Sequence, residues 1–92
     1  MNAIEAIAAE RQRQIEVEGW TPDHDDKHGN GELAKAAACY AMGQPLSLAK
    51  TGWKIWPWEA RWWKPDASRR RNLVKAGALI VAEIERLDRS HP

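Results

Sequence analysis

The sequence predicts an all-α domain of three helices, with an irregular Trp-rich insertion between the second helix and the third. One stretch of good helix formers lies near each end of the chain and carries apolar residues at helical spacing. A shorter, alanine-rich stretch lies between them, bounded by Gly and Pro residues that favour helix ends. At 92 residues the chain has the size of one domain, so we expect residues 1–92 to form a single helical domain.

The first helix is expected from Ala3 to about Glu18. Apolar or helix-forming residues recur in it at helical spacing, at Ile4, Ile7, Ala8, Arg11 and Ile15. Gly19 favours a helix end, and Pro22 disfavours continuation beyond it. Residues 20–31 are rich in Asp, His, Gly and Asn, so we expect them to form a polar loop.

The second helix is expected from Glu32 to about Met42, with a cap near Asn30. Gly43 and Pro45 should end it. Alanine occupies much of this stretch, and such small side chains permit a neighbouring helix to approach closely.

The Trp-rich insertion, residues 46–64, is expected to be irregular because Gly and Pro interrupt it. The chain has six Trp and no Phe, and five of the six Trp lie between Trp53 and Trp63. One interpretation is that they cover a core that three helices alone leave too small. The other is that some of them stack on a ligand, since base–aromatic stacking contributes about 1–3 kcal/mol per base. The two interpretations can apply to different residues of the cluster.

The third helix is expected to begin near Ser68, with Asp66 or Ser68 as its N-cap, and to reach about Arg89. Its apolar stripe comprises Leu73, Ala76, Gly77, Ile80, Ile84 and Leu87, backed by Leu79 and Val81. Gly within a helix costs about 1 kcal/mol relative to Ala, so we expect a close helix contact at Gly77 to compensate. We expect the first and third helices to pack lengthwise, the second to lie across them, and residues 53–63 to fold over one end.

Charge is split along the chain, although the total is only +1. Residues 1–32 hold three Lys or Arg against eight Asp or Glu, a sum of −5, and residues 33–92 hold eleven against five, a sum of +6. Such a split can serve packing within the chain, head-to-tail association, or an anionic ligand held by the basic half. Composition does not choose among these.

Self-association is expected because the core is small and disulfides cannot supplement it. Cys39 is the only cysteine, which excludes an intrachain disulfide and a zinc site built from several cysteines of one chain. Leu79 and Val81 place apolar residues on more than one face of the last helix, which favours a homo-oligomer, a dimer or higher. With no signal-peptide pattern and no apolar run of about 20 residues, we expect a cytoplasmic protein without a membrane partner.

No catalytic signature is apparent, and we expect neither an enzyme nor a bound cofactor. MazG-type nucleotide pyrophosphohydrolases pair Glu-x-x-Glu on one helix with Glu-x-x-Asp on another, and only Glu85 and Asp88 match half of that pattern. Cys39, among alanines, is typical of a small buried hydrophobic residue rather than a nucleophile. The Asp and His residues of the 20–31 loop match no standard metal-binding spacing, so no metal site is expected.

Residues 7–26 resemble the ryanodine-receptor-type (RyR) repeat, in which a helix leads into a Gly-Trp pair and then an Asp-Asp pair. The matching residues are Gly19, Trp20, Asp25 and Asp26, and Leu33, Tyr40 and the stripe of the last helix follow as in that repeat. The His-Pro step after the repeat's acidic pair is replaced by His28-Gly29, and the Trp-rich insertion is foreign to the repeat. The chain is also similar to small bacteriophage and prophage proteins that share its Glu-Gly-Trp-Thr-Pro, His-Asp-Asp and Trp-Pro-Trp elements.

These resemblances imply an RyR-like helical fold and raise the expectation of nucleotide binding, because RyR-like domains are linked with bacterial sensing of nucleotide signals. Similarity to phage proteins implies an anti-defence role in the host cytoplasm, where small oligomeric proteins sequester such signals. Neither resemblance implies a catalytic activity.

The favoured function is therefore binding of a small phosphorylated ligand of nucleotide type without turnover. Aromatic rings suit a base, clustered cations suit phosphates, and an acidic pair suits sugar hydroxyls or amino groups. The expected ligand-binding residues are Trp20, His24, Asp25, Asp26, Tyr40, Trp56, Trp58, Trp62, Trp63, Arg69, Arg70 and Lys75. The alternative is a nucleic-acid or protein-interaction module using Arg69, Arg70 and Arg71, although a net charge of +1 is a poor basis for duplex binding. A pyrophosphohydrolase-like enzyme is a lesser alternative.

Overall fold

The computed structural model describes residues 1–48 and 53–90 and confirms the all-α fold class. The described helices are α1 (Ala3–Glu16), α2 (Pro22–Asp25), α3 (Glu32–Met42) and α4 (Arg69–Ser90). A short 3-10 helix, η1 (Ala60–Trp62), and a two-residue antiparallel pairing of β1 (Ser47–Leu48) with β2 (Trp53–Lys54) lie between α3 and α4. None of the helices in these ranges has the length and apolar character that crossing a membrane requires.

Helix α1 begins with a capping box. The Asn2 side chain accepts a hydrogen bond from the Glu5 N–H at 2.8 Å, and the Glu5 carboxylate accepts one from the Asn2 N–H at 3.1 Å. At its other end α1 is two residues shorter than expected. Gly19 has a φ of +76°, and the resulting turn allows the Trp20 N–H to donate to the Gln14 carbonyl at 2.9 Å.

The prediction of a loop throughout residues 20–31 was wrong in part, because this segment contains the helical turn α2. The Thr21 hydroxyl caps the turn by accepting from the His24 N–H at 3.3 Å. Pro22 occupies the first helical turn, where its fixed φ suits a helix and its missing N–H costs nothing. The turn gives His24 a defined position.

Helix α3 has the predicted bounds, but its N-terminal cap differs from the prediction. The capping residue is Gly31, with a φ of +81°, and it makes no side-chain capping bond. Asn30 contributes its backbone N–H, which donates to the Glu32 carboxylate at 2.6 Å. At the other end Gly43 has a φ of +77°, and its N–H donates to the Cys39 carbonyl at 2.8 Å.

Helix α4 begins after Ser68, whose hydroxyl accepts a hydrogen bond from the Arg71 N–H at 3.2 Å, as the sequence predicted. The expected close contact at Gly77 is also confirmed. A Cβ atom at Gly77 would lie 2.7 Å from Cδ1 of Ile7, so α1 approaches α4 more closely than a side chain at this position would permit.

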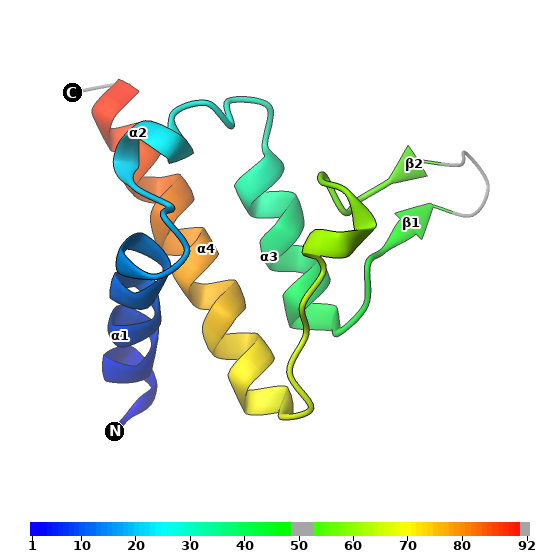
Figure 1. Ribbon diagram of the computed structural model, residues 1–92, viewed down its shortest axis with the longest axis horizontal. Coiled ribbons are helices and arrows are strands. Elements are labelled where there is room, and N and C mark those ends of the chain that lie inside the picture. The colour runs from blue at the N-terminus through cyan, green and yellow to red at the C-terminus, as the bar shows by residue number, and fades with distance from the viewer. Residues whose placement is uncertain (49–52, 91–92) are drawn as a thin grey trace.

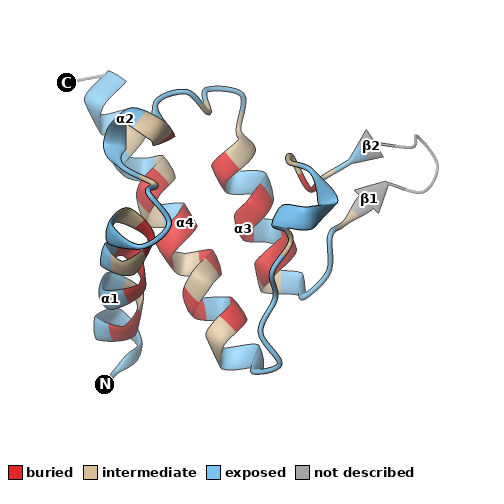
Figure 2. Cartoon of the chain, in the orientation of Figure 1, coloured by how far each residue is buried: buried red, intermediate tan, exposed pale blue. Residues whose placement is uncertain are grey.

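The predicted arrangement of the helices was wrong in one respect. Helix α3 does not lie across α1 and α4 but packs on the opposite side of α4 from α1 (Figure 1). The core between α3 and α4 contains mostly small residues, which bring the two helices together: Leu33, Ala36, Ala37, Cys39, Tyr40, Ala76, Leu79 and Ala82. Figure 2 shows the buried positions along both helices.

The apolar stripe predicted for the core side of the last helix was wrong at four positions. Four of its side chains are largely exposed: Leu73 (43%), Ile80 (50%), Ile84 (52%) and Leu87 (44%). Helix α4 instead buries Val74, Ala78, Leu79 and Ala82. Two helices flank α4, so its buried surface is wider than one stripe, and alanine is the residue that lets both neighbours approach.

The tryptophans differ in burial. Trp56 is buried in the core, and Trp20, Trp58 and Trp63 pack against the core while half-buried. Trp62 is 50% exposed. Residues 49–52 and the side chain of Trp53 lie outside the described part of the chain. Several tryptophans therefore complete the core, as one of the two interpretations requires.

Candidate functional site

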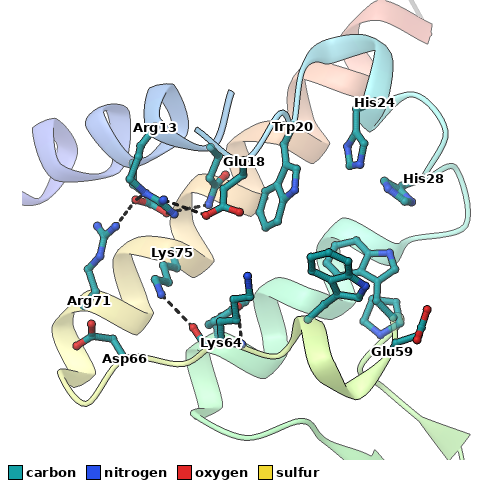
Figure 3. A pocket seen from close by; sticks show the side chains of 16 residues that line it. Arg13, Glu18, Trp20, His24, His28, Glu59, Lys64, Asp66, Arg71 and Lys75 are labelled. Carbon is teal, nitrogen blue, oxygen red and sulfur yellow. Dashed lines mark hydrogen bonds and ion pairs between the residues drawn. The ribbon is translucent and has the colours of Figure 1, made fainter. Parts of the chain in front are cut away.

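A cavity of about 780 Å³ is lined by residues of α1, α2, α3, η1, α4 and their connecting segments (Figure 3). This volume lies in the range typical of sites for small molecules. Figure 3 shows Arg71, Lys75 and Arg13 on one side of the cavity and His24 and His28 on the other. The lining is therefore different at its two ends.

One end of the cavity is an aromatic quartet made of Trp20, His24, His28 and Trp58. The rings of Trp20 and His24 are nearly parallel, at 7°, with centroids 6.5 Å apart. The His24 and His28 centroids are 4.9 Å apart, and those of His28 and Trp58 are 5.3 Å apart. Trp20 and Trp58, at 6.2 Å, close the quartet.

Neighbouring residues fix the quartet. The His28 ring lies 3.3 Å from the Glu32 carboxylate at the start of α3. Trp58 packs edge-on against the buried Trp56, with ring centroids 5.4 Å apart. The Trp56 indole N–H in turn donates to the Glu59 carbonyl at 3.1 Å. The aromatic surfaces are thus held in place by the core before any ligand is bound.

At the other end, the buried Glu10 carboxylate is held by two arginines. Arg13 donates to both of its oxygens, at 2.8 and 3.0 Å, and Arg71 of α4 donates to one of them. Burial raises the pKa of Glu10, but the hydrogen bonds and charges of Arg13 and Arg71 outweigh burial, so this pKa lies below its usual value. Arg13 also reaches Glu18, at 3.1 Å. This network joins α1 to α4.

Lys75 lies on the charged side of the cavity, next to the ring of Tyr40. Its ammonium donates to the Lys64 carbonyl at 3.0 Å and lies 5.6 Å from the centroid of the Tyr40 ring. Burial lowers the pKa of Lys75, and the neighbouring Arg71 lowers it further. The Tyr40 hydroxyl accepts a hydrogen bond from the Lys64 N–H at 3.3 Å. These contacts hold a cation next to an aromatic face.

Gln14 offers the cavity a hydrogen-bond acceptor. This side chain is 2% exposed and lines the cavity from α1. Its amide nitrogen donates to Glu10 at 3.2 Å, and a carboxylate can only accept, so the amide orientation is fixed. Its oxygen Oε1 is buried and has no hydrogen-bond partner among the described residues. Buried acceptors of this kind are uncommon, and a ligand donor that reached this oxygen would satisfy it.

Formal charges within the lining balance. Four cations, namely Arg13, Lys64, Arg71 and Lys75, stand against four carboxylates, namely Glu10, Glu18, Glu59 and Asp66. Arg13 and Arg71 are engaged with Glu10, whereas the Lys75 ammonium donates to a neutral carbonyl. Such a lining suits a ligand of modest negative charge better than a polyanion.

Half of the residues that the sequence suggested for ligand binding line the cavity: Trp20, His24, Tyr40, Trp58, Trp62 and Lys75. The other half do not: Asp25, Asp26, Trp56, Trp63, Arg69 and Arg70. These six residues form ion pairs between helices, pack in the core or lie on the exposed surface.

The acidic pair connects α2 to the two longest helices. Asp25 is fully buried and accepts from Arg11 of α1 at 2.8 Å. Asp26 accepts from Arg89 of α4 at 2.7 Å. The Asp26–Arg89 and Glu10–Arg71 pairs join the acidic and basic halves of the sequence, so part of the charge split serves packing within the chain.

The remaining residues lie in the core or on the surface. Trp56 and Trp63 pack against each other with centroids 5.1 Å apart, and both contact the Tyr40 ring. Arg69 and Arg70 are exposed, and Arg70 approaches the Met1 carbonyl at 3.5 Å. Three consecutive arginines on a helix point in three directions about 100° apart, so only one of them reaches the cavity.

Sequence reasoning did not select several lining residues, although some left a signal. Arg71 and Lys75 are four residues apart and therefore share a face of α4, which favours Arg71 over its two neighbours. Glu10, Arg13 and Gln14 have the same kind of spacing on α1. No local pattern indicated that these polar positions would face α4, because an amphipathic helix is expected to bury its apolar side.

The described residues that line the cavity include no Ser, Thr or Cys side chain. Cys39 is buried in the core, and burial raises the pKa of its thiol. Within residues 1–48 and 53–90, no group of three or more His, Cys, Asp or Glu side chains could hold a metal ion. Comparison of the chain with protein-family models, with curated proteins and with solved structures finds no match.

Proposed function

We propose that this protein binds a small phosphorylated ligand of nucleotide type and does not turn it over. The observation that carries the proposal is the division of one cavity into an aromatic end and a charged end. A nucleotide has the same division, with a flat base at one end and an anion at the other.

The aromatic quartet supports the base-binding part of this proposal. Trp20 and Trp58 line the cavity while half-buried, so each presents part of its ring to a ligand. A base stacked on such a ring gains about 1–3 kcal/mol. The core already holds both rings in place, so little conformational entropy is lost on binding.

Lys75 and Arg71 support the phosphate-binding part. Lys75 contributes a partly desolvated cation, and the guanidinium of Arg71 has five N–H donors, of which Glu10 does not use all. The Gln14 oxygen and the Glu18 carboxylate would then accept hydrogen bonds from sugar hydroxyls or a base amino group. Balanced formal charge favours one or two phosphate groups over a longer chain.

Binding without turnover is proposed because the described lining pairs no Ser, Thr or Cys nucleophile with a base, and no group of three or more described His, Cys, Asp or Glu side chains could hold a catalytic metal ion. The corresponding biological role is sequestration or sensing of a nucleotide signal, and the similarity to phage proteins favours a signal of host defence. The rival use of Arg69, Arg70 and Arg71 as one basic patch gains no support, since Arg71 pairs with Glu10.

Tryptophan fluorescence tests the proposal directly. The purified protein is titrated with cyclic dinucleotides, cyclic trinucleotides, ADP-ribose isomers and common mononucleotides, and its melting temperature is measured with each. We expect at least one compound to change the fluorescence and raise the melting temperature. No change with any compound at millimolar concentration would overturn the proposal. Mass spectrometry of the recovered ligand should show it unaltered, and an altered ligand would contradict binding without turnover.

A further inference from the structure

The four exposed apolar residues of α4 form a regular ridge. These residues, here the α4 ridge, have exposed fractions between 43% and 52%: Leu73, Ile80, Ile84 and Leu87. With Gly77 included, successive positions are four, three, four and three residues apart. This alternation is the heptad spacing by which one helix packs along another.

The α4 ridge faces away from the cavity. Each residue turns a helix by about 100°, so Leu73 lies about 160° from both Arg71 and Lys75, which line the cavity. The molecule measures 36 × 32 × 20 Å, and α1, α4 and α3 lie side by side when viewed down the short axis (Figure 1). One face of this helix layer therefore carries the cavity, and the other carries the ridge.

A layer of helices normally buries its apolar face against a second layer. Within the described part of the chain, no element covers the α4 ridge. We propose that a second copy of this protein covers it, in a two-fold symmetric dimer whose α4 helices pack against each other in antiparallel orientation.

Shape supports the antiparallel arrangement. Pairing centred on Ile80 places Leu73 of one copy opposite Leu87 of the other. It also places Gly77 within one residue of the level of Ile84. The side chain of Ile7 packs on Gly77, so the ridge stays apolar at the one position where α4 lacks a side chain. Each level of the interface then pairs apolar groups.

Charge complementarity favours the same orientation. Helix α4 begins with Arg69 and Arg70 and has Asp88 near its end. Antiparallel pairing brings Arg70 of one copy to the level of Asp88 of the other, on the same flank of the ridge. Parallel pairing would instead gather Arg69 and Arg70 of both copies at the same end of the interface, and like charges at close distance disfavour association.

Light scattering coupled to size-exclusion chromatography tests the interface. The wild-type chain should have twice its mass of 10.4 kDa at tens of micromolar. Ile84→Glu should give a folded monomer, with an unchanged circular dichroism spectrum. Met42→Glu is the matched control, because Met42 is an exposed apolar residue of α3, and it should remain dimeric. A wild-type monomer, or an Ile84→Glu variant that remains a dimer, would overturn the proposal.

Disulfide cross-linking tests the orientation, and native Cys39 is buried in the core. Ile80→Cys alone should cross-link, because Ile80 lies on the two-fold axis. Leu73→Cys and Leu87→Cys should cross-link when the two variants are mixed. Efficient cross-linking of Leu73→Cys with itself would show parallel helices and overturn the antiparallel arrangement. These outcomes do not depend on what the cavity binds.

Discussion

Helix α4 packs against α3 mainly through apolar side chains and against α1 largely through polar and charged ones. On the α3 side the contact is made by apolar side chains such as Ala36 and Leu79, both 0% exposed. On the α1 side three of the four buried α1 residues are polar or charged, namely Glu10, Arg11 and Gln14. The α3–α4 contact, here the apolar seam, is filled by apolar side chains. The α1–α4 contact, here the polar seam, combines the close approach of Ile7 to Gly77 with the Glu10 network that borders the cavity. The difference indicates that α3 and α4 stabilise the fold and that α1 and α4 build the site.

The largest expected effect comes from breaking the buried ion pair between α1 and α2. Asp25→Ala would leave the Arg11 guanidinium buried without its closest partner. We expect the free energy of unfolding to fall by about 3 kcal/mol, measured by urea denaturation. Asp26→Ala is the matched control, since its pair with Arg89 is partly exposed, and it should cost much less. Equal losses would contradict the distinction between the two carboxylates.

The apolar seam should respond to volume instead of charge. Ala36→Leu inserts bulk between α3 and α4 where no space is available, and it should destabilise the fold by about 1–3 kcal/mol. Ala38→Leu, at an exposed position of the same helix, should leave stability nearly unchanged. Chemical denaturation of both variants provides the comparison, and tolerance of leucine at Ala36 would show that this seam is not close-packed.

The polar seam should weaken in acid. The folded-state pKa of Glu10 lies below its usual value of 4.5, so its stabilisation is present above about pH 4.5 and is lost as the pH falls through the lower folded value. Between about pH 5 and pH 3, wild-type stability should therefore fall more steeply than that of Glu10→Gln. Glu16→Gln, an exposed change on the same helix, should behave like wild type. Parallel curves for all three proteins would contradict this role of Glu10.

The smallest effect on stability should come from Gln14→Leu, which separates binding from folding. This change removes a buried acceptor without a partner and also one hydrogen bond to Glu10. These effects oppose each other, so the free energy of unfolding should change by less than about 1 kcal/mol. Ligand affinity should fall about 3- to 10-fold, because the ligand loses one hydrogen bond. Unchanged affinity would show that Gln14 does not contact the ligand.

Local signals in the sequence predicted much of the fold. The bounds of α3 and the start of α4 followed from Gly43 and Ser68, which act within a few residues of themselves. Thr21 and Pro22 are typical of a helix start, but α2 was not predicted because a single turn is too short to show a periodic pattern of apolar residues. The fold class was predictable because these elements depend little on distant contacts.

The side of α4 that becomes buried could not be predicted in the same way. Periodicity identifies an apolar stripe, and the largest residues made Ile80 and Ile84 the natural choice. Burial instead follows Ala78 and Ala82, because two helices flank α4 and need small residues to approach it. The same limit applies to the site. Trp20 and Lys75 could be named by residue type, whereas Gln14 depends on which side of α1 meets α4.

The cavity at the polar seam is proposed to bind a nucleotide through a stacked base and a partly desolvated cation, Lys75. Calorimetric titration with the best compound of the panel, beside its unphosphorylated nucleoside, tests this claim on wild type, Lys75→Met and Arg70→Met. Lys75→Met should weaken nucleotide binding about 10- to 100-fold through loss of one charge-assisted contact, and should leave nucleoside binding unchanged. Arg70→Met, outside the cavity lining, should bind like wild type. Equal nucleotide affinity in all three proteins would contradict the account.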